Sequence, residues 1–396
     1  MKPLVYVVVN ESVGSGLLRA QLLQPLQGAG LADQVQIVNL LHPLGRPATG
    51  VRRLSTLRCG IPARLYQFKL GGLLDKLVAA YYAAALAWVV PRGSRVVARS
   101  YFSALAVALL QRVKPLEFVF DTRSQFVQEN VSAGRLRPGS GAHRRWLEIE
   151  SSLLNRAVKV LAVSEAQARY YREIAPNACL QVIPCFCQPD ERLLGADMRE
   201  DGRRQMGFMP HDTVVCYYGS LDHKWNNIRM YADFFADCLE QGIRICVITP
   251  SADELRADTR LNRPEAFIAQ IDDSLRARQL IAACDHGVII MKKADDWESR
   301  LGVKFVEYLG AGLQVLVGEW VGAAADTVRC HFPDSGIVVS GEMPQPPPML
   351  RQTSDAQRLN IARRAASMFG YHRMLDVFDL KVPQYGTLTG EDFPHE

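Results

Sequence analysis

The residues whose types and spacing could do chemistry are concentrated in the segment 298–312. Gly302 precedes a helical pattern that begins at Val303, so the free main-chain amides at the start of that helix would face an anion such as a phosphate. Lys304 and Glu307 are three residues apart and therefore share one helix face. The amides and the Lys304 ammonium suit a diphosphate, and the Glu307 carboxylate suits ribose hydroxyls one turn further on. An exposed ion pair of little consequence is the alternative interpretation.

A second glycine with a basic neighbour follows the apolar run 214–218. Gly219 and Ser220 close this predicted strand, and Lys224 comes before the next helical pattern. A residue without a side chain lets a diphosphate approach main-chain amides, and lysine supplies a compact positive charge. These residues therefore extend the predicted phosphate-binding set, although the pattern is weak when it stands alone.

The first loop of the chain, residues 10–16, joins an apolar run to a helical pattern and contains Gly14 and Gly16. Glycines there allow a phosphate or sugar to approach the backbone. A dinucleotide fingerprint requires a third glycine where Arg19 stands, which argues against a nicotinamide cofactor. An ordinary tight turn is the alternative.

Asp121 and Arg123 follow the apolar run 116–120. Polar residues just past the carboxyl end of a parallel strand lie where open α/β sheets bind ligands. We therefore include both in the candidate site, with a surface ion pair as the alternative.

These segments fall at the strand ends of an alternation of strands and helices, which predicts parallel sheets covered by helices on both faces. Helical spacing fills the gaps between the apolar runs, as in 17–26, 73–89 and 354–369. The predicted strands lie at 4–9, 35–41, 95–99, 116–120, 158–163, 181–186, 214–218, 243–249, 287–291, 314–317 and 337–339.

Residues 303–316, VKFVEYLGAGLQVL, resemble the donor-site motif of retaining GT-B glycosyltransferases of family four. The closest branch builds bacterial surface polysaccharides and lipopolysaccharide. Further similarity at 163–165, 182–184 and 218–220 extends the resemblance over most of the chain. The resemblance implies an α/β protein of GT-B architecture, with two doubly wound Rossmann-like domains facing a cleft. It also implies a nucleotide-sugar donor, of UDP or GDP type.

The resemblance assigns roles residue by residue. The family glutamate aligned with Glu307 binds the donor ribose, and the glycine aligned with Gly219 admits the diphosphate, which a basic residue matched by Lys224 binds. Many members carry a sugar-contacting glutamate where this chain has Ser299, and an arginine where it has Ser220. The predicted donor-binding residues are Gly219, Ser220, Lys224, Ser299, Gly302, Val303, Lys304 and Glu307.

The implied reaction retains the anomeric configuration, and the leaving phosphate takes the proton of the acceptor hydroxyl. We predict Lys224 and Lys304 to stabilise that phosphate and Asp121 to orient the acceptor, which makes these three the predicted catalytic residues. Gly14, Gly16 and Arg123 form the predicted acceptor or phosphate loop. The sequence holds no Asp-x-Asp pair, so we expect neither a metal nor another cofactor.

A chain of 396 residues exceeds one ordinary core, which favours two domains. A break in composition after 183–184, followed by the charged segment 188–204, predicts the linker. We predict an acceptor-side domain at 1–190 and a nucleotide-sugar domain at 191–370. Residues 371–396 are predicted to pack back toward the first domain and to end in a frayed tail.

The predicted location is the cytoplasm, because the chain opens without a signal peptide and its nine cysteines show no disulfide or metal spacing. The apolar run 77–90 is shorter than the roughly 20 residues that span a bilayer, and we expect a buried or interfacial helix there. Segment 42–76 is strongly basic and includes Arg52, Arg53 and Arg58. It predicts reversible docking on the anionic inner face of the cytoplasmic membrane, with a solvated loop as the alternative.

Three other functions remain open at this stage. The chain could be another GT-B enzyme, such as a sugar-nucleotide epimerase or a phosphorylase, or a binding or scaffold subunit that has lost its chemistry. A periplasmic-type binding protein is disfavoured by the opening of the chain and by the free cysteines. The net charge of +5 is mild, and no nucleic-acid partner is expected.

Overall fold

The structure is a computed structural model and describes residues 2–221 and 226–380. Its first sheet is entirely parallel, with strand order β3-β2-β1-β4-β5-β6-β7. All six residues of β1 are buried, because helices cover both faces of the sheet. The strands are β1 (Leu4–Val9), β2 (Val35–Leu40), β3 (Leu54–Leu57), β4 (Arg95–Arg99), β5 (Glu117–Asp121), β6 (Lys159–Ala162) and β7 (Leu180–Val182).

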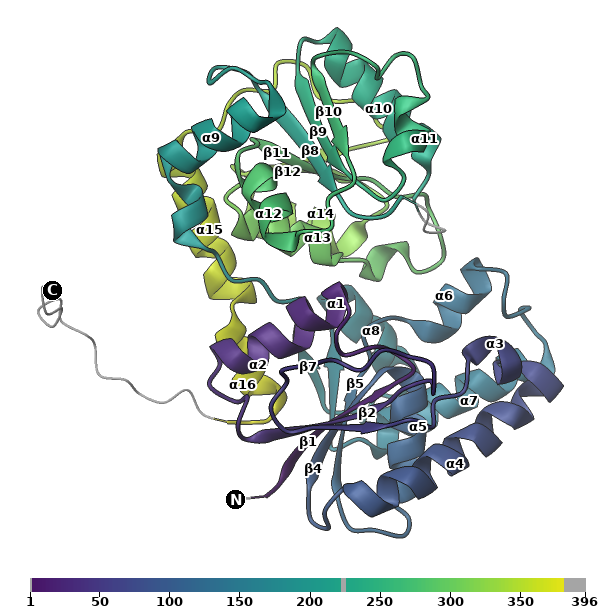
Figure 1. Cartoon of the computed structure of the whole chain (residues 1–396). Coiled ribbons are helices and arrows are strands. Elements are labelled where there is room, and N and C mark those ends of the chain that lie inside the picture. Colours follow the sequence, from purple (N-terminus) through teal and green to yellow (C-terminus); the bar gives the residue numbers. More distant parts are fainter. Residues whose placement is uncertain (1, 222–225, 381–396) are drawn as a thin grey trace, which may run out of the picture.

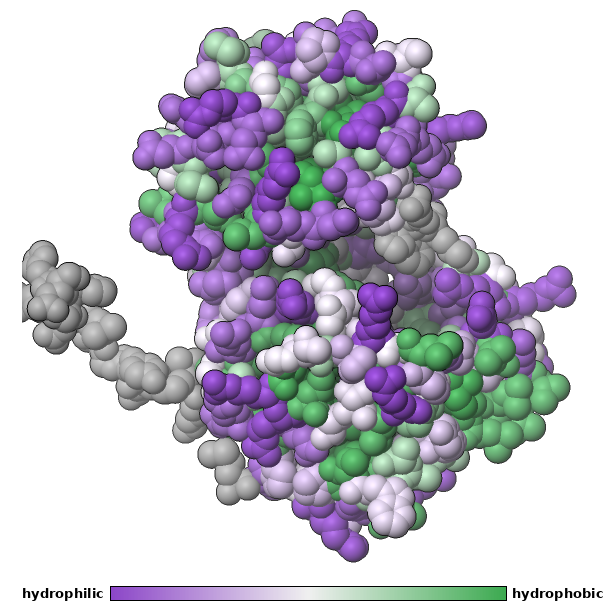
Figure 2. Space-filling view, viewed as in Figure 1, coloured by the Kyte–Doolittle hydropathy of each residue, from purple (hydrophilic) through white to green (hydrophobic). Residues whose placement is uncertain are grey.

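The second sheet is also parallel and has the order β10-β9-β8-β11-β12-β13. The two sheets form two lobes, with a hollow between them (Figures 1 and 2). The prediction of two doubly wound domains is therefore confirmed. The strands are β8 (Val214–Tyr218), β9 (Arg244–Ile248), β10 (Ala266–Ala269), β11 (His286–Ile289), β12 (Gln314–Gly318) and β13 (Gly336–Val339).

Helices and helical turns connect the strands of both lobes. In the first lobe they are α1 (Gly16–Leu18), η1 (Arg19–Leu23), α2 (Gln24–Gly28), α3 (Ala63–Tyr66), η2 (Lys69–Gly72), α4 (Leu73–Val89), α5 (Ser100–Leu110), α6 (Phe126–Ser132), α7 (Gly141–Arg156) and α8 (Glu165–Ile174). The rest are η3 (Glu191–Leu194), α9 (Ala196–Met206), α10 (Ile228–Glu240), α11 (Ala252–Arg256), α12 (Ser274–Ala282), η4 (Trp297–Ser299), α13 (Val303–Gly310), α14 (Gly322–His331), α15 (Asp355–Phe369), η5 (Tyr371–Arg373) and α16 (Met374–Val377).

The structure places a helix in the charged segment 188–204, where the sequence predicts the linker. Helix α9 occupies most of the charged segment 188–204, and Gly207, at φ +78°, ends it in the left-handed conformation. Its acidic and basic residues lie largely on the outer face, while Gly202, Arg203 and Met206 are buried against the second lobe. The charges therefore mark an amphipathic helix rather than an extended connection.

The chain crosses back to the first lobe after α15 (Figure 1). Met374, Leu375, Val377 and Phe378 join the core of the first lobe on the face that also holds Leu4 and Tyr6. The Lys159 ammonium donates to the Asp376 carbonyl at 2.6 Å, and Arg95 donates to the Phe378 carbonyl at 2.6 Å.

Polar contacts fix the first crossing between the lobes. The fully buried amide of Gln21 donates to the Phe186 carbonyl at 3.0 Å and accepts from the Phe186 N–H at 2.8 Å. On the α8 side, the Ser164 hydroxyl donates to the Ser299 carbonyl at 3.1 Å. The lobes are thus joined both by the linker and across the hollow.

Helix α4 covers the apolar run 77–90 and has two apolar faces. Ala79, Tyr82 and Leu86 are buried in the core of the first lobe. The opposite face exposes Leu73, Leu77, Tyr81 and Trp88. By length and composition alone, the segment Lys69–Val89 is long and apolar enough to cross a membrane. In the protein, however, 39% of its most apolar stretch of 18 residues is buried. The buried face shows that α4 is a core helix with one uncovered side.

Candidate functional site

The strand orders place one switch point in each sheet, between β1 and β4 and between β8 and β11. At a switch point the connections leave in opposite directions, which opens a crevice at the carboxyl ends of the strands. Gly219 directly follows β8, and Arg99 ends β4. Ligands are therefore expected at these two positions.

Tyr308 docks α13 against the crevice of the second lobe. Its ring lies so close to the backbone of β11 that a Cβ at Gly287 would come within 2.3 Å of it. Its hydroxyl accepts a hydrogen bond from the Tyr218 N–H at 2.9 Å. This contact sets the position of the residues one turn earlier in α13.

Lys304 consequently lies over Gly219. A Cβ at Gly219 would be 2.5 Å from Lys304 Cε and 2.8 Å from its Nζ, and the φ of Gly219 is +129°, where side chains are strained. The ammonium also lies 5.2 Å from the centre of the Tyr217 ring. The structure thus brings together the glycine and the lysine that the sequence placed in separate motifs.

The first amides of α13 receive no side-chain cap, because the residue at the N-cap position is Gly302. Gly302 has φ +78°, and a Cβ there would lie 2.7 Å from Ile289 Cδ1, so only glycine fits. Val303 begins the helix and is half-buried.

Lys304 and Glu307 do not pair. In the described part of the chain neither side chain makes an ion pair within 4 Å, and both residues are half-buried. The alternative interpretation, an exposed ion pair between Lys304 and Glu307, is therefore excluded. Burial raises the pKa of Glu307 to about 7, although Lys304 and Arg278 act against the shift. Burial likewise lowers the pKa of Lys304, against the effect of Glu307. Half-buried charges without a partner are typical of a site that a ligand completes.

The two predicted serines differ in exposure, since Ser299 is buried and Ser220 is half-buried. The Ser299 hydroxyl donates to the Asp296 carbonyl at 3.0 Å, and the residue is buried. The Ser220 carbonyl accepts hydrogen bonds from the Tyr217 hydroxyl at 2.8 Å and from the Asn226 amide at 3.0 Å. Lys224 lies outside the described residues.

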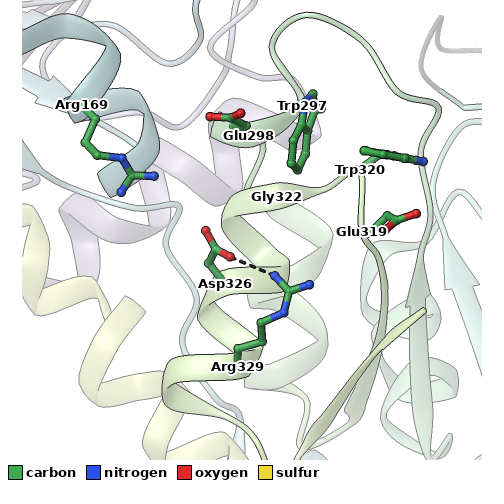
Figure 3. Close-up of a pocket in the computed structure, with 8 residues that line it drawn as sticks. All are labelled: Arg169, Trp297, Glu298, Glu319, Trp320, Gly322, Asp326 and Arg329. Carbon is green, nitrogen blue, oxygen red and sulfur yellow. Dashed lines mark hydrogen bonds and ion pairs between the residues drawn. The ribbon is translucent and has the colours of Figure 1, made fainter. Parts of the chain in front are cut away.

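Glu298 lines a different pocket, of about 200 Å³, between α8 and α14. Figure 3 shows its carboxylate on the side facing Arg169, with the Asp326–Arg329 ion pair below. None of the residues predicted for the donor lines this pocket. Glu298 therefore lines a pocket that contains none of the predicted donor-binding residues.

In the first lobe, Asp121 and Arg123 form a buried cluster instead of a surface pair. Arg123 Nε lies 2.8 Å from Asp121 Oδ1, and the Tyr6 hydroxyl donates to Asp121. The Asp121 side chain is 2% exposed and that of Arg123 is 13% exposed. Arg123 is thus the member that a ligand can touch, and Asp121 holds it in place.

Sequence reasoning missed Arg99, which ends β4 beside this cluster. Its Nε lies 3.3 Å from Glu11 Oε2, and its buried Nη1 has no hydrogen-bond partner among the described residues. An arginine at the end of an otherwise apolar strand was the available signal.

The two glycines of the first loop differ in their surroundings. A Cβ at Gly14 would lie 3.3 Å from Ala48 Cβ, so the loop lies close to the segment after β2. Gly16 has open space around it. Ser15 caps the following helix through the Leu18 N–H at 3.3 Å.

No family model and no curated protein matches the sequence. Among solved structures the chain is similar to sucrose-phosphate synthase from Thermosynechococcus elongatus, at 16% identity and TM-score 0.62 over 96% of this chain and 98% of that one. It is similar to HepE from Anabaena in complex with UDP, at 14% identity and TM-score 0.63 over 96% and 98%. WaaG, a glycosyltransferase involved in lipopolysaccharide biosynthesis, matches at 14% identity and TM-score 0.58 over 95% and 97%. The chain therefore has the GT-B fold, as predicted.

Proposed function

We propose that this protein transfers a sugar from a nucleotide-sugar donor to a glycan or lipid-linked acceptor, with retention and without a metal. The observation that carries the proposal is the arrangement at the β8–β11 switch point, where Lys304 lies over Gly219 and Glu307 follows one turn later. The solved HepE structure contains UDP, and the similarity of fold supports a nucleotide ligand for this chain as well.

In the proposed mechanism the diphosphate lies against Gly219 and the first amides of α13, with Lys304 neutralising its charge. Glu307 accepts hydrogen bonds from the ribose hydroxyls. As the glycosidic bond breaks, the leaving phosphate gains charge, which Lys304 stabilises, and it accepts the proton of the acceptor hydroxyl. Asp121 holds Arg123 toward the acceptor side.

Activity should persist in excess EDTA, because Lys304 and main-chain amides carry the charge of the leaving group. The test measures transfer from UDP-, GDP-, ADP- and CMP-sugars, first ranked by thermal shift. Activity lost on chelation and restored by Mg²⁺ or Mn²⁺ would show that a metal holds the diphosphate. Donor binding without hydrolysis or transfer would instead favour a scaffold subunit. This alternative is specific because Ser299 stands where many members of the family that the sequence resembles carry a sugar-contacting glutamate.

Donor binding should release a proton near pH 7. Burial raises the pKa of Glu307 to about 7, and ribose hydroxyls that donate to its carboxylate favour the ionised form. Affinity should therefore fall as the pH drops from 7.5 to 5.5, by up to roughly tenfold per unit below the pKa. The number of protons released on donor binding is measured by calorimetric titration in buffers of different ionisation enthalpy. A Glu307→Gln variant should release none, and equal release by both proteins would contradict the assignment.

We further propose that the enzyme works on the inner face of the cytoplasmic membrane. The exposed apolar face of α4 is continuous with Leu65 and Leu70, and exposed cations flank it at Arg64, Lys69 and Lys76. Figure 2 shows this apolar area over α3 and α4. Apolar side chains ringed by cations suit an anionic leaflet.

Liposomes containing anionic lipid should float the protein at low salt and release it near 0.5 M salt, where the screening length is about 4 Å. Replacing Leu77 and Trp88 by serine should abolish flotation. Replacing Arg52, Arg53 and Arg58 by glutamine tests the basic segment. Of these three residues, Arg52 forms an ion pair with Asp33 at 2.7 Å. If both variants float like the parent, the membrane proposal is wrong.

A further inference from the structure

A pocket of about 270 Å³ lies in the first lobe between the loop after β1 and the loop after β2. Both loops follow carboxyl ends of parallel strands, where α/β sheets bind ligands. The polar side chains that line it are those of Ser12, Ser15, Arg19, Arg46 and Thr49.

Positive charge dominates this pocket. Of the described residues that line it, none is acidic. Arg19 and Arg46 make no ion pair with any described residue, whereas Arg52 and Arg99 pair with Asp33 and Glu11. A bound anion would be attracted by both guanidinium groups. Guanidinium groups and hydroxyls together match a phosphate, which arginine binds through two parallel hydrogen bonds.

The walls of the pocket are held in place by short-range contacts. The Ser12 hydroxyl donates to the Arg46 carbonyl at 3.2 Å, which links the two loops. The Ser15 N–H donates to the Ser12 carbonyl at 2.9 Å and closes the first loop as a turn. Gly14 allows the loops to approach, since its Cβ would already press on Ala48. The loop that carries Arg46 is thus tied to the loop after β1.

We propose that this pocket binds a phosphate group carried by the acceptor. That the acceptor carries this phosphate rests on the proposed function, whereas phosphate binding by the pocket does not. All the residues that line the pocket belong to the first lobe, whereas Gly219 and Lys304 belong to the second. A phosphorylated sugar and the phosphate of a lipid headgroup present the same chemistry to Arg19 and Arg46.

The test is calorimetric titration of the full chain with inorganic phosphate in the presence of saturating UDP, which fills the proposed donor site. Replacing Arg19 and Arg46 together by glutamine should weaken phosphate binding at least tenfold and leave UDP affinity unchanged. The matched control replaces Arg92 and Arg112 by glutamine and should bind phosphate like the parent. These two exposed arginines precede β4 and β5 and so lie toward the amino ends of the strands. Parental phosphate affinity in the Arg19→Gln, Arg46→Gln variant would overturn the proposal.

If UDP fails to bind at all, the proposed function fails, and the same phosphate titration on a Lys304→Gln background still tests the pocket. Vesicles containing phosphatidylglycerol identify the source of the phosphate. The pocket is assigned to a lipid headgroup if the Arg19→Gln, Arg46→Gln variant no longer floats with the vesicles. Soluble phosphate should then also prevent the parent from floating, because it competes for the same pocket. Unchanged flotation combined with weakened phosphate binding assigns it to a soluble phosphorylated acceptor.

Discussion

Replacing Glu307 by alanine should weaken nucleotide-sugar binding by roughly 1.5–3 kcal/mol, the range for hydrogen bonds to a charged group, which is about 10- to 150-fold in Kd. The carboxylate has no ion-pair partner in the described structure, so its loss removes ribose contacts and leaves no protein group unpaired. Calorimetric titration with the donor found in the thermal-shift panel measures the change.

The same substitution should not lower the stability of the free protein at pH 7.5. Burial raises the folded pKa of Glu307 to about 7, above the unfolded value near 4.5, so the folded state binds the extra proton between these values. This side chain therefore costs stability increasingly as the pH rises through that window. Glu298→Ala is the control, because its exposed carboxylate lines the other pocket. Donor affinity like that of the parent in Glu307→Ala would rule out the ribose contact.

Replacing Asp285 by alanine should destabilise the second lobe by about 3–5 kcal/mol, the cost of breaking a buried ion pair. This carboxylate is fully buried and accepts hydrogen bonds from Arg199, from Arg203 at 2.8 Å, and from the Val214 N–H at 2.8 Å. Arg203 is 1% exposed, so removing its partner leaves an uncompensated charge in the core.

Urea unfolding followed by far-UV circular dichroism measures the loss. Asp201→Ala serves as the matched control, since Asp201 pairs with Arg204 on the surface at 2.7 Å. An exposed pair contributes at most about 1 kcal/mol. Equal effects of the two substitutions would show that the Asp285 cluster does not stabilise the lobe.

The central strands were predictable because their apolar runs are continuous, as in β1, where every residue is buried. The edge strands β3 and β10 were not predicted. Each has four residues, and β3 is half-buried along its whole length, so its sequence lacks the apolar run. Tertiary pairing with β2 and β9 makes these segments strands.

Within the candidate site, spacing along one helix predicted that Lys304 and Glu307 share a face. It could not predict that the Tyr308 ring lies against Gly287, because that contact joins residues of different elements. The sequence could not predict the orientation of Glu298 either, since it depends on how η4 lies between α8 and α14. The charge pattern of 188–204 suggested a linker because surface helices and linkers are both rich in charge.

The return of α16 to the first lobe has a consequence for synthesis of the chain. The side chains of Met374, Leu375, Val377 and Phe378 complete a core layer whose other members come from the first half of the sequence. On the ribosome, the first lobe must therefore wait until residue 378 has emerged before this layer can close. Until then the lobe made first carries uncovered apolar surface, and the lobe made second is the one that can finish folding earlier.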